Sequence, residues 1–391
     1  MRFAALSCCL LWLGLGPGLA APARAGAGAE PGEPRETMGQ IFEALRVALP
    51  ASLRDERFAD PAQRERILAA LDALARNGER LEAHGRSRDA SFAFLSRSLA
   101  QDARAIRDRY AAGHPDEARF LLHELTQTCV ACHSRLPSER ASSLAERFVS
   151  QEEIARLPLD ERARLELATR QFDRALGTYE ELCADPATSP DYLDLAGHLD
   201  DYLELCLRVA GTPGRAIPVL EKLAARPDSS LGLRESAAGW IASLKRLVAQ
   251  GPVGTPLEQA RALVRQGDES SRFANDRRGL VPYIAASGVL YRDLERRREH
   301  GPELAEAYYL LGVIESRIGR AYWISQTEHF LETAIRLSPG APFAEDAYEL
   351  LEEFLLSGYT GSAGSELPAE ERRRLEDLRD LIERSRPAAQ G

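Results

Sequence analysis

The sequence of 391 residues predicts an all-α protein with two helical domains. No segment alternates apolar and polar residues over a length that would make a strand. Up to about residue 140, apolar residues recur every three or four positions, as on one face of an amphipathic helix. Beyond residue 143 the helical segments become shorter and come in pairs. We therefore expect an antiparallel four-helix bundle over residues 36–142, followed by a helical-hairpin array over residues 143–391.

Short connections between the first helical segments predict the antiparallel bundle. The second segment begins with Asp60 as N-cap and Pro61 in its first turn. A polar turn over residues 84–89 precedes the third, and Gly113 and Pro115 separate the third from the fourth. The apolar face of the first segment holds Met38, Ile41, Phe42, Leu45 and Leu49.

The second half of the chain resembles a degenerate tetratricopeptide-like array. Ala168, Phe172 and Ala175 have the spacing of the second helix of such a unit, in which small residues let two helices approach closely. A further unit extends from Tyr308 to Pro339, and residues 368–385 form a polar helix that caps the end. An irregular helical domain without repeats is the alternative.

The first 25 residues have the layout of a secretory signal peptide. Arg2 precedes a mostly apolar stretch over residues 6–19, and the small-residue segment Ala23-Arg24-Ala25 follows it. The alternative, a retained membrane anchor, would need roughly 20 uninterrupted apolar residues. We expect cleavage after Ala25, a flexible leader over residues 26–35, a periplasmic location, and no membrane span in the mature chain.

Charge and motif content disfavour several classes of function. The formal net charge is −10, and the acidic excess lies outside residues 35–140, so nucleic acid is not an expected partner. Nothing resembles a hydrolytic triad or a dinucleotide-binding fingerprint. A peroxidase-like enzyme would need a distal acid-base residue, which we could not identify, so we expect a protein that is not an enzyme.

The sharpest signal is the C-x2-C-H motif of Cys129, Cys132 and His133. Its two thiols lie within one helical turn and can form thioether bonds to haem vinyl groups, while the following imidazole can bind the iron. A thioredoxin-like redox pair would need a strand before the motif and a helix opening at it. A structural zinc site would need two more Cys or His ligands. The motif therefore predicts one covalently bound haem c.

A C-x2-C-H motif near the end of the fourth helix of a bundle resembles the class II cytochromes c, the cytochrome c′ group and its low-spin relatives. The resemblance covers residues 36–140, roughly a quarter of the chain, and implies a haem wedged between the helices. In that family an aromatic and a basic residue often follow the motif, whereas Ser134, Arg135, Leu136 and Pro137 follow it here.

The other face of the iron decides between electron transfer and gas binding. In low-spin members of the resembling family, a methionine on the first helix is the sixth ligand, which makes Met38 the candidate distal ligand. Met38 as a core residue is the alternative. Among the histidines, His123 shares a helix with His133, and His84 and His114 are expected to be solvated at helix ends.

Together these features predict an exported electron-transfer cytochrome whose array docks a periplasmic redox protein or a membrane electron-transfer complex. Two alternatives stay open. One is a five-coordinate haem protein that binds or senses NO or CO, and the other is an interaction scaffold in which the haem is structural.

Overall fold

A computed structural model describes residues 33–52, 55–86, 90–135, 155–251, 253–273, 276–296, 301–318, 325–361 and 364–385. Within these ranges the chain is helical except for loops and one pair of two-residue strands, β1 (Thr360–Gly361) and β2 (Gly364–Ser365). The predicted all-α class is confirmed. The predicted signal peptide and residues 26–32 of the predicted leader lie outside the described residues, but residues 33–35 already belong to the first helix rather than to a leader.

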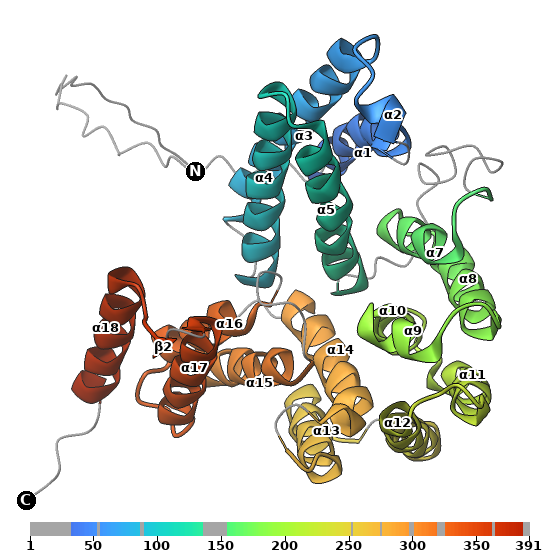
Figure 1. The fold of residues 1–391 in the computed structure, drawn as a ribbon. Helices are drawn as coiled ribbons and strands as arrows, with labels where there is room; N and C mark the ends of the chain where they lie inside the picture. Colours follow the sequence, from blue (N-terminus) through green and yellow to red (C-terminus); the bar gives the residue numbers. More distant parts are fainter. Residues whose placement is uncertain are drawn as a thin grey trace, which may run out of the picture.

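Four long helices make up the N-terminal part, with each packed along the next (Figure 1). They are α1 (Glu33–Ser52), α3 (Arg64–Gly85), α4 (Ala90–Ala111) and α5 (Pro115–Arg135), with the short α2 (Asp55–Phe58) after α1. Their apolar faces meet in one core whose members include Ile41, Leu49, Ile67, Leu71, Leu74, Leu99, Ile106, Ala118, Leu122 and Leu125. The three- and four-residue spacing thus predicted these helices correctly.

The start of the second long helix differs from the prediction. Asp60 was expected to be the N-cap, but its carboxylate accepts a hydrogen bond from the Ala62 amide at 2.9 Å and closes a separate turn. Helix α3 begins only at Arg64. The turn follows α2, which is fixed by a hydrogen bond of 3.0 Å from the Tyr110 hydroxyl to the Phe58 carbonyl.

The second part of the chain follows a curve of successive helices, and α16 returns to contact α4 (Figure 1). Neighbours in the pairs α7 and α8, α11 and α12, α13 and α14, and α15 and α16 pack closely. The elements are α7 (Leu159–Ala168), α8 (Phe172–Ala184), α9 (Pro190–Leu195), α10 (His198–Glu204), the π-helix η2 (Leu205–Val209), α11 (Pro213–Ala225), α12 (Leu231–Gln250), α13 (Pro256–Ser270), the 3-10 helix η3 (Arg277–Gly279), α14 (Leu280–Arg296), α15 (Pro302–Ile318), α16 (Thr327–Leu337), α17 (Ala344–Gly358) and α18 (Ala369–Ser385).

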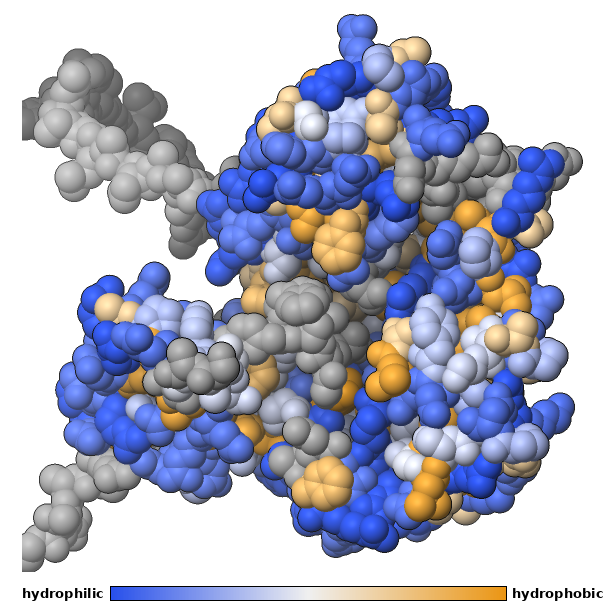
Figure 2. Space-filling view, viewed as in Figure 1, coloured by the Kyte–Doolittle hydropathy of each residue, from blue (hydrophilic) through white to orange (hydrophobic). Residues whose placement is uncertain are grey.

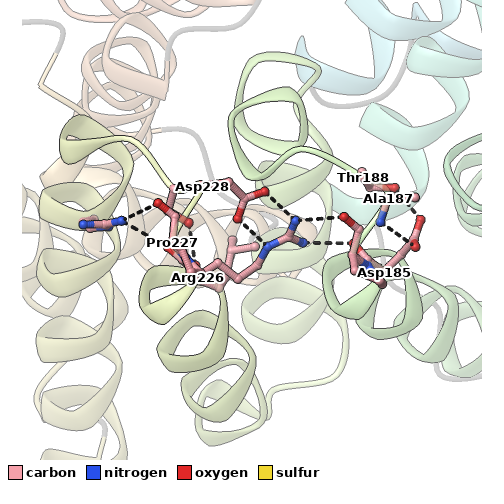
Figure 3. Close-up of polar contacts among 10 residues, drawn as sticks. Asp185, Ala187, Thr188, Arg226, Pro227 and Asp228 are labelled. Atoms are coloured by element: carbon pink, nitrogen blue, oxygen red, sulfur yellow. Dashed lines mark hydrogen bonds and ion pairs between the residues drawn. The ribbon is translucent and has the colours of Figure 1, made fainter.

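A recurring turn ends several of these helices. Helices α8, α11 and α16 each end one or two residues before a proline, at Pro186, Pro227 and Pro339. A residue before proline avoids helical geometry, so the helix must stop there. Arg226 joins two of these turns, because its guanidinium donates to the Asp185 carbonyl at 2.9 Å and pairs with the carboxylate of its own turn (Figure 3).

The two parts of the chain share their cores at the point where α5 meets α7. Val130 of α5 is 1% exposed and belongs to the core of the second part. Conversely, Leu165 of α7 is buried in the core of the first part, and Leu157 packs against it. The predicted boundary at residue 142 lies outside the described residues, but side chains from either side of it cross into the other core.

No helix in the described ranges is long and apolar enough to cross a bilayer. The face shown in Figure 2 is mostly hydrophilic, and its apolar residues form separate small patches.

Gly312 of α15 provides a test of the helix pairing. A Cβ atom there would lie 2.4 Å from Leu331 Cδ2 and 3.3 Å from the Leu331 amide nitrogen on α16. Gly312→Ala should therefore lower the free energy of unfolding by about 1–3 kcal/mol through overpacking. Urea denaturation of both proteins measures this difference.

Gly177 is the matched control, because it lies within α8 and a Cβ atom added there would meet no other atom within 4 Å. Gly177→Ala should raise the free energy of unfolding by roughly 0.5–1 kcal/mol, since alanine has the higher helix propensity. Equal stabilisation by both substitutions would contradict the close packing of α15 on α16.

Candidate functional site

The last turns of α5 bring the three residues of the C-x2-C-H motif onto one side of the helix. Cys129, Cys132 and His133 stand at positions i, i+3 and i+4, which face the same way in an α-helix. Between them, Val130 and Ala131 are each 1% exposed and hold the helix against its neighbours. The motif is therefore fixed on a packed helix, with two thiols and one imidazole directed to one side.

Burial favours the uncharged forms of Cys129 and His133. It raises the pKa of the Cys129 thiol to about 12, and the neighbouring Cys132 adds to this effect. It also lowers the pKa of His133 to about 4, with a further contribution from the positive charge of Arg170. Near neutral pH the chain therefore presents a thiol rather than a thiolate at Cys129, and a neutral imidazole at His133.

The imidazole of His133 is oriented by the second part of the chain. Its Nδ1 lies 2.7 Å from the carbonyl oxygen of Ala168, the last residue of α7. A carbonyl can only accept a hydrogen bond, so Nδ1 carries the proton and Nε2 keeps its lone pair. This is the tautomer in which Nε2 can bind a metal ion, with the carbonyl as the outer partner that fixes the ring.

The residue after the motif is tied to a buried ion pair. The Ser134 hydroxyl donates to the Glu204 carboxylate at 3.0 Å, and Glu204 pairs with Arg208 at 2.9 Å. Both charged side chains are almost completely buried. Arg208 lies in the π-helix η2, donates to the Ser287 hydroxyl at 2.8 Å, and stacks over the Tyr291 ring. Polar contacts thus extend from α5 through η2 to α14.

Met38 lies at the same end of the N-terminal helices as the motif. The end of α1 contacts the middle of α5, where Ser52 Oγ and His123 Nε2 are 3.1 Å apart. Along α1, Met38 is about 21 Å from Ser52, and along α5, His133 is about 15 Å from His123, at a rise of 1.5 Å per residue. Gln40, two residues after Met38, accepts a hydrogen bond from Arg80 near the C-terminal end of α3. Met38 is partly buried and packs against the N-terminal core. Its role as an iron ligand remains a prediction.

The prediction for His84 was wrong. His84 was expected to be solvated at a helix end, but both of its ring nitrogens are shielded from solvent. Its ring packs edge-on against Phe92 of α4, with 6.3 Å between centroids. Helix α3 continues to Gly85 and α4 begins at Ala90, so the His84 side chain lies between the ends of the two helices. His84 thus lies at the end of the N-terminal helices that holds Met38.

The remaining histidines lie away from the motif face or outside the described residues. His114 is exposed beside Glu117, as predicted. His329 of α16 stacks on Phe94 of α4, with 5.4 Å between centroids, so the far part of the array also reaches the motif end of the N-terminal helices. His300 lies outside the described residues.

No group of three or more His, Cys, Asp or Glu side chains gathers as a metal site in the described ranges. A haem iron takes four nitrogens from the porphyrin and only its axial ligands from the protein. The donor set of two thiols and one oriented imidazole on one helix face fits that requirement. Comparison with known proteins finds no matching family model, no similar curated sequence and no similar solved structure.

Several residues around the motif could not be identified from the sequence. The Ala168 carbonyl is 35 residues from His133, and Glu204 is 70 residues from Ser134. The only available signal was the predicted place of Ala168 with Phe172 and Ala175 in the second helix of a repeat unit. The structure instead makes Ala168 the last residue of α7, and nothing in the sequence indicated which group its carbonyl would meet.

Replacing one partner of the buried ion pair should destabilise the whole site. Arg208→Leu leaves the Glu204 carboxylate in the interior without its cation and should cost about 3–5 kcal/mol of unfolding free energy. The double substitution Glu204→Leu with Arg208→Leu should cost less than Arg208→Leu alone. Thermal or urea denaturation of the set gives the comparison.

Lys245→Leu is the control, because Lys245 pairs with Glu221 at the surface. It should change stability by about 0–1 kcal/mol. If Arg208→Leu were no more destabilising than this control, the buried pair would not stabilise the junction.

Proposed function

We propose that the chain is an exported c-type cytochrome with one haem, attached through Cys129 and Cys132, with its iron bound by His133 Nε2. The observation that carries this proposal is the oriented imidazole beside two thiols on one helix face. When bound, the haem supplies a reversible one-electron couple at its iron. The protein's residues hold it, orient its axial ligand and exclude water.

Attachment needs no external oxidant. Cys129 and Cys132 would each add their thiol across one vinyl double bond, with a new sulfur–carbon bond at one vinyl carbon and the thiol hydrogen on the other. This addition would require both thiols in the reduced state, and the structure joins neither Cys129 nor Cys132 in a disulfide.

The main alternative uses of the two cysteines receive less support. A thiol–disulfide exchange pair depends on a lowered thiol pKa, usually at a helix N-terminus. Here the motif is at the C-terminal end of α5, and burial raises the Cys129 pKa to about 12. The orientation of His133 also favours a metal ligand over a redox partner of the thiols.

We also propose the finer fold, a cytochrome c′-like four-helix bundle joined to a tetratricopeptide-like array. The successive packing of α1, α3, α4 and α5 supports the first part. The repeated helix pairs support the second part, and a proline turn follows two of them, α7 with α8 and α15 with α16. In this proposal the haem lies at the end of the bundle that the array encloses.

Electron transfer is the proposed activity, with the array as the docking domain for a periplasmic redox protein or a membrane electron-transfer complex. A groove between α9, α12 and η3 supports a docking role, since the strongly exposed side chains Leu195 and Phe273 line it together with charged residues. Exposed apolar side chains within a polar rim are typical of protein-binding surfaces.

Covalent attachment should depend on both motif cysteines. Mature wild-type protein from a host with cytochrome c maturation should keep its haem after acid-acetone extraction. The double variant Cys129→Ser with Cys132→Ser should lose it, and each single variant should keep one thioether. Cys183→Ala, which alters a buried thiol in the array, should retain the haem. Extraction of the wild-type haem into solvent would rule out thioether attachment.

Met38 should bind the iron if the protein is an electron carrier. The ferric protein should then be low spin, with the weak sulfur–iron charge-transfer band at the red end of the visible spectrum. Met38→Ala should abolish this band, open the iron to CO and lower the reduction potential.

His84→Ala is the companion variant, because His84 lies at the same end of the helices. It should leave the band in place. If the band is absent from wild type and His84→Ala opens the iron, His84 is the distal ligand. A wild-type protein that is high spin and binds CO readily would favour a gas-binding function over electron transfer.

A further inference from the structure

The turn after α7 ends the helix in a specific way. Two backbone hydrogen bonds close it, from the Arg170 amide to the Leu167 carbonyl at 3.0 Å and from the Gln171 amide to the Glu166 carbonyl at 2.8 Å. This pair of bonds is the Schellman motif. The C-cap is Thr169, and the motif needs a left-handed residue directly after it. Arg170 occupies that position with φ of 63°.

An arginine is unusual there, since glycine reaches positive φ without strain between Cβ and the backbone. Among the described residues, Arg170 is the one residue other than glycine with positive φ. The chain uses glycine at positive φ elsewhere, for example at Gly113 and Gly197. A strained residue of this kind persists where its side chain has a use, so the arginine side chain requires an explanation.

The position of the turn supplies the explanation. The carbonyl of Ala168, two residues before Arg170, is the group that holds His133. The guanidinium of Arg170 stacks over the Phe172 ring, 5.7 Å from its centroid. From there its charge lies within electrostatic range of His133 and Cys132. An arginine keeps its charge in proteins, so a permanent cation stands beside the motif.

We propose that Arg170 raises the reduction potential of the haem, as a tuning residue that the array places on the His133 side of the site. This inference rests on the proposed cytochrome function. Ferric iron carries one more positive charge than ferrous iron, so a fixed cation nearby disfavours the ferric state. The electron that reduces the iron comes from a redox protein in the cell, and from a mediator dye in the test.

The test is spectroelectrochemical titration of the mature, full-length haem protein. Arg170→Gln should lower the ratio of reduced to oxidised protein about tenfold at the wild-type midpoint, which is a shift of about 59 mV for a one-electron couple. A single charge in a partly buried site gives an effect of this order. Arg170→Lys should keep most of the wild-type ratio, because it keeps the charge.

Arg170→Gly distinguishes the effect of the arginine charge from the effect of the strained backbone. It should lower the potential as Arg170→Gln does, while raising the midpoint of thermal unfolding because glycine relieves the strained φ. Arg174→Gln is the matched control, since it removes a charge from an exposed arginine one turn further along α8. At the wild-type midpoint potential, its ratio of reduced to oxidised protein should stay within twofold of the wild-type ratio.

The outcomes are distinguishable. If the wild type carries covalent haem but Arg170→Gln and Arg170→Gly leave the potential unchanged, the tuning role is wrong and the cytochrome function stands. The tuning role is also wrong if Arg170→Gln shifts the reduction potential no more than Arg174→Gln does, because the shift would then reflect the net surface charge of the protein. If the wild type carries no covalent haem, both the tuning role and the proposed function fail.

Discussion

The hydrogen bond between His133 and the Ala168 carbonyl connects the chemistry of the motif to the fold. It fixes the imidazole in the tautomer that leaves Nε2 available, and the acceptor comes from a helix on the other side of the predicted domain boundary. The position of this hydrogen bond depends on how α5 packs against α7. That packing depends on Val130 in one core and Leu165 in the other, so both parts of the chain determine the geometry of one side chain.

The buried pair of Glu204 and Arg208 holds the same junction by a different kind of interaction. Two charges withdrawn from water cost free energy, which their attraction offsets only when the geometry is good and further hydrogen bonds complete it. Ser134 and Ser287 supply such bonds from α5 and α14. Arg208 lies in the π-helix η2, which continues α10 directly, and π-helical turns are frequent at functional sites.

Local features of the sequence predicted local features of the structure. The spacing of Ile67, Leu71 and Leu74 predicted a helix because apolar periodicity depends on neighbouring residues only, and the C-x2-C-H spacing placed three functional groups on one face for the same reason. The Asp60 cap was misjudged because a side chain that can cap a helix can equally close a turn. His84 was misjudged because its burial depends on how α3 and α4 end, which no pattern around residue 84 reveals.

The contacts that complete the site were beyond prediction for a physical reason. They join residues 35 and 70 positions apart, and they depend on how α7 and the helix that ends in η2 pack against α5, which no local pattern of the sequence reveals. The strained φ of Arg170 was equally hidden, since an arginine after a helix does not by itself indicate a left-handed turn.

The account holds that both parts of the chain position His133. The most direct test is the rate at which its Nδ1 proton exchanges with water, measured by nitrogen-15-edited NMR of the mature haem protein. A proton held by the Ala168 carbonyl inside the α5–α7 junction should give a resolved signal that exchanges slowly with water, and it should persist at pH values where surface histidines exchange at once. A His133 Nδ1 proton that exchanges as fast as that of the exposed His114 would contradict the account.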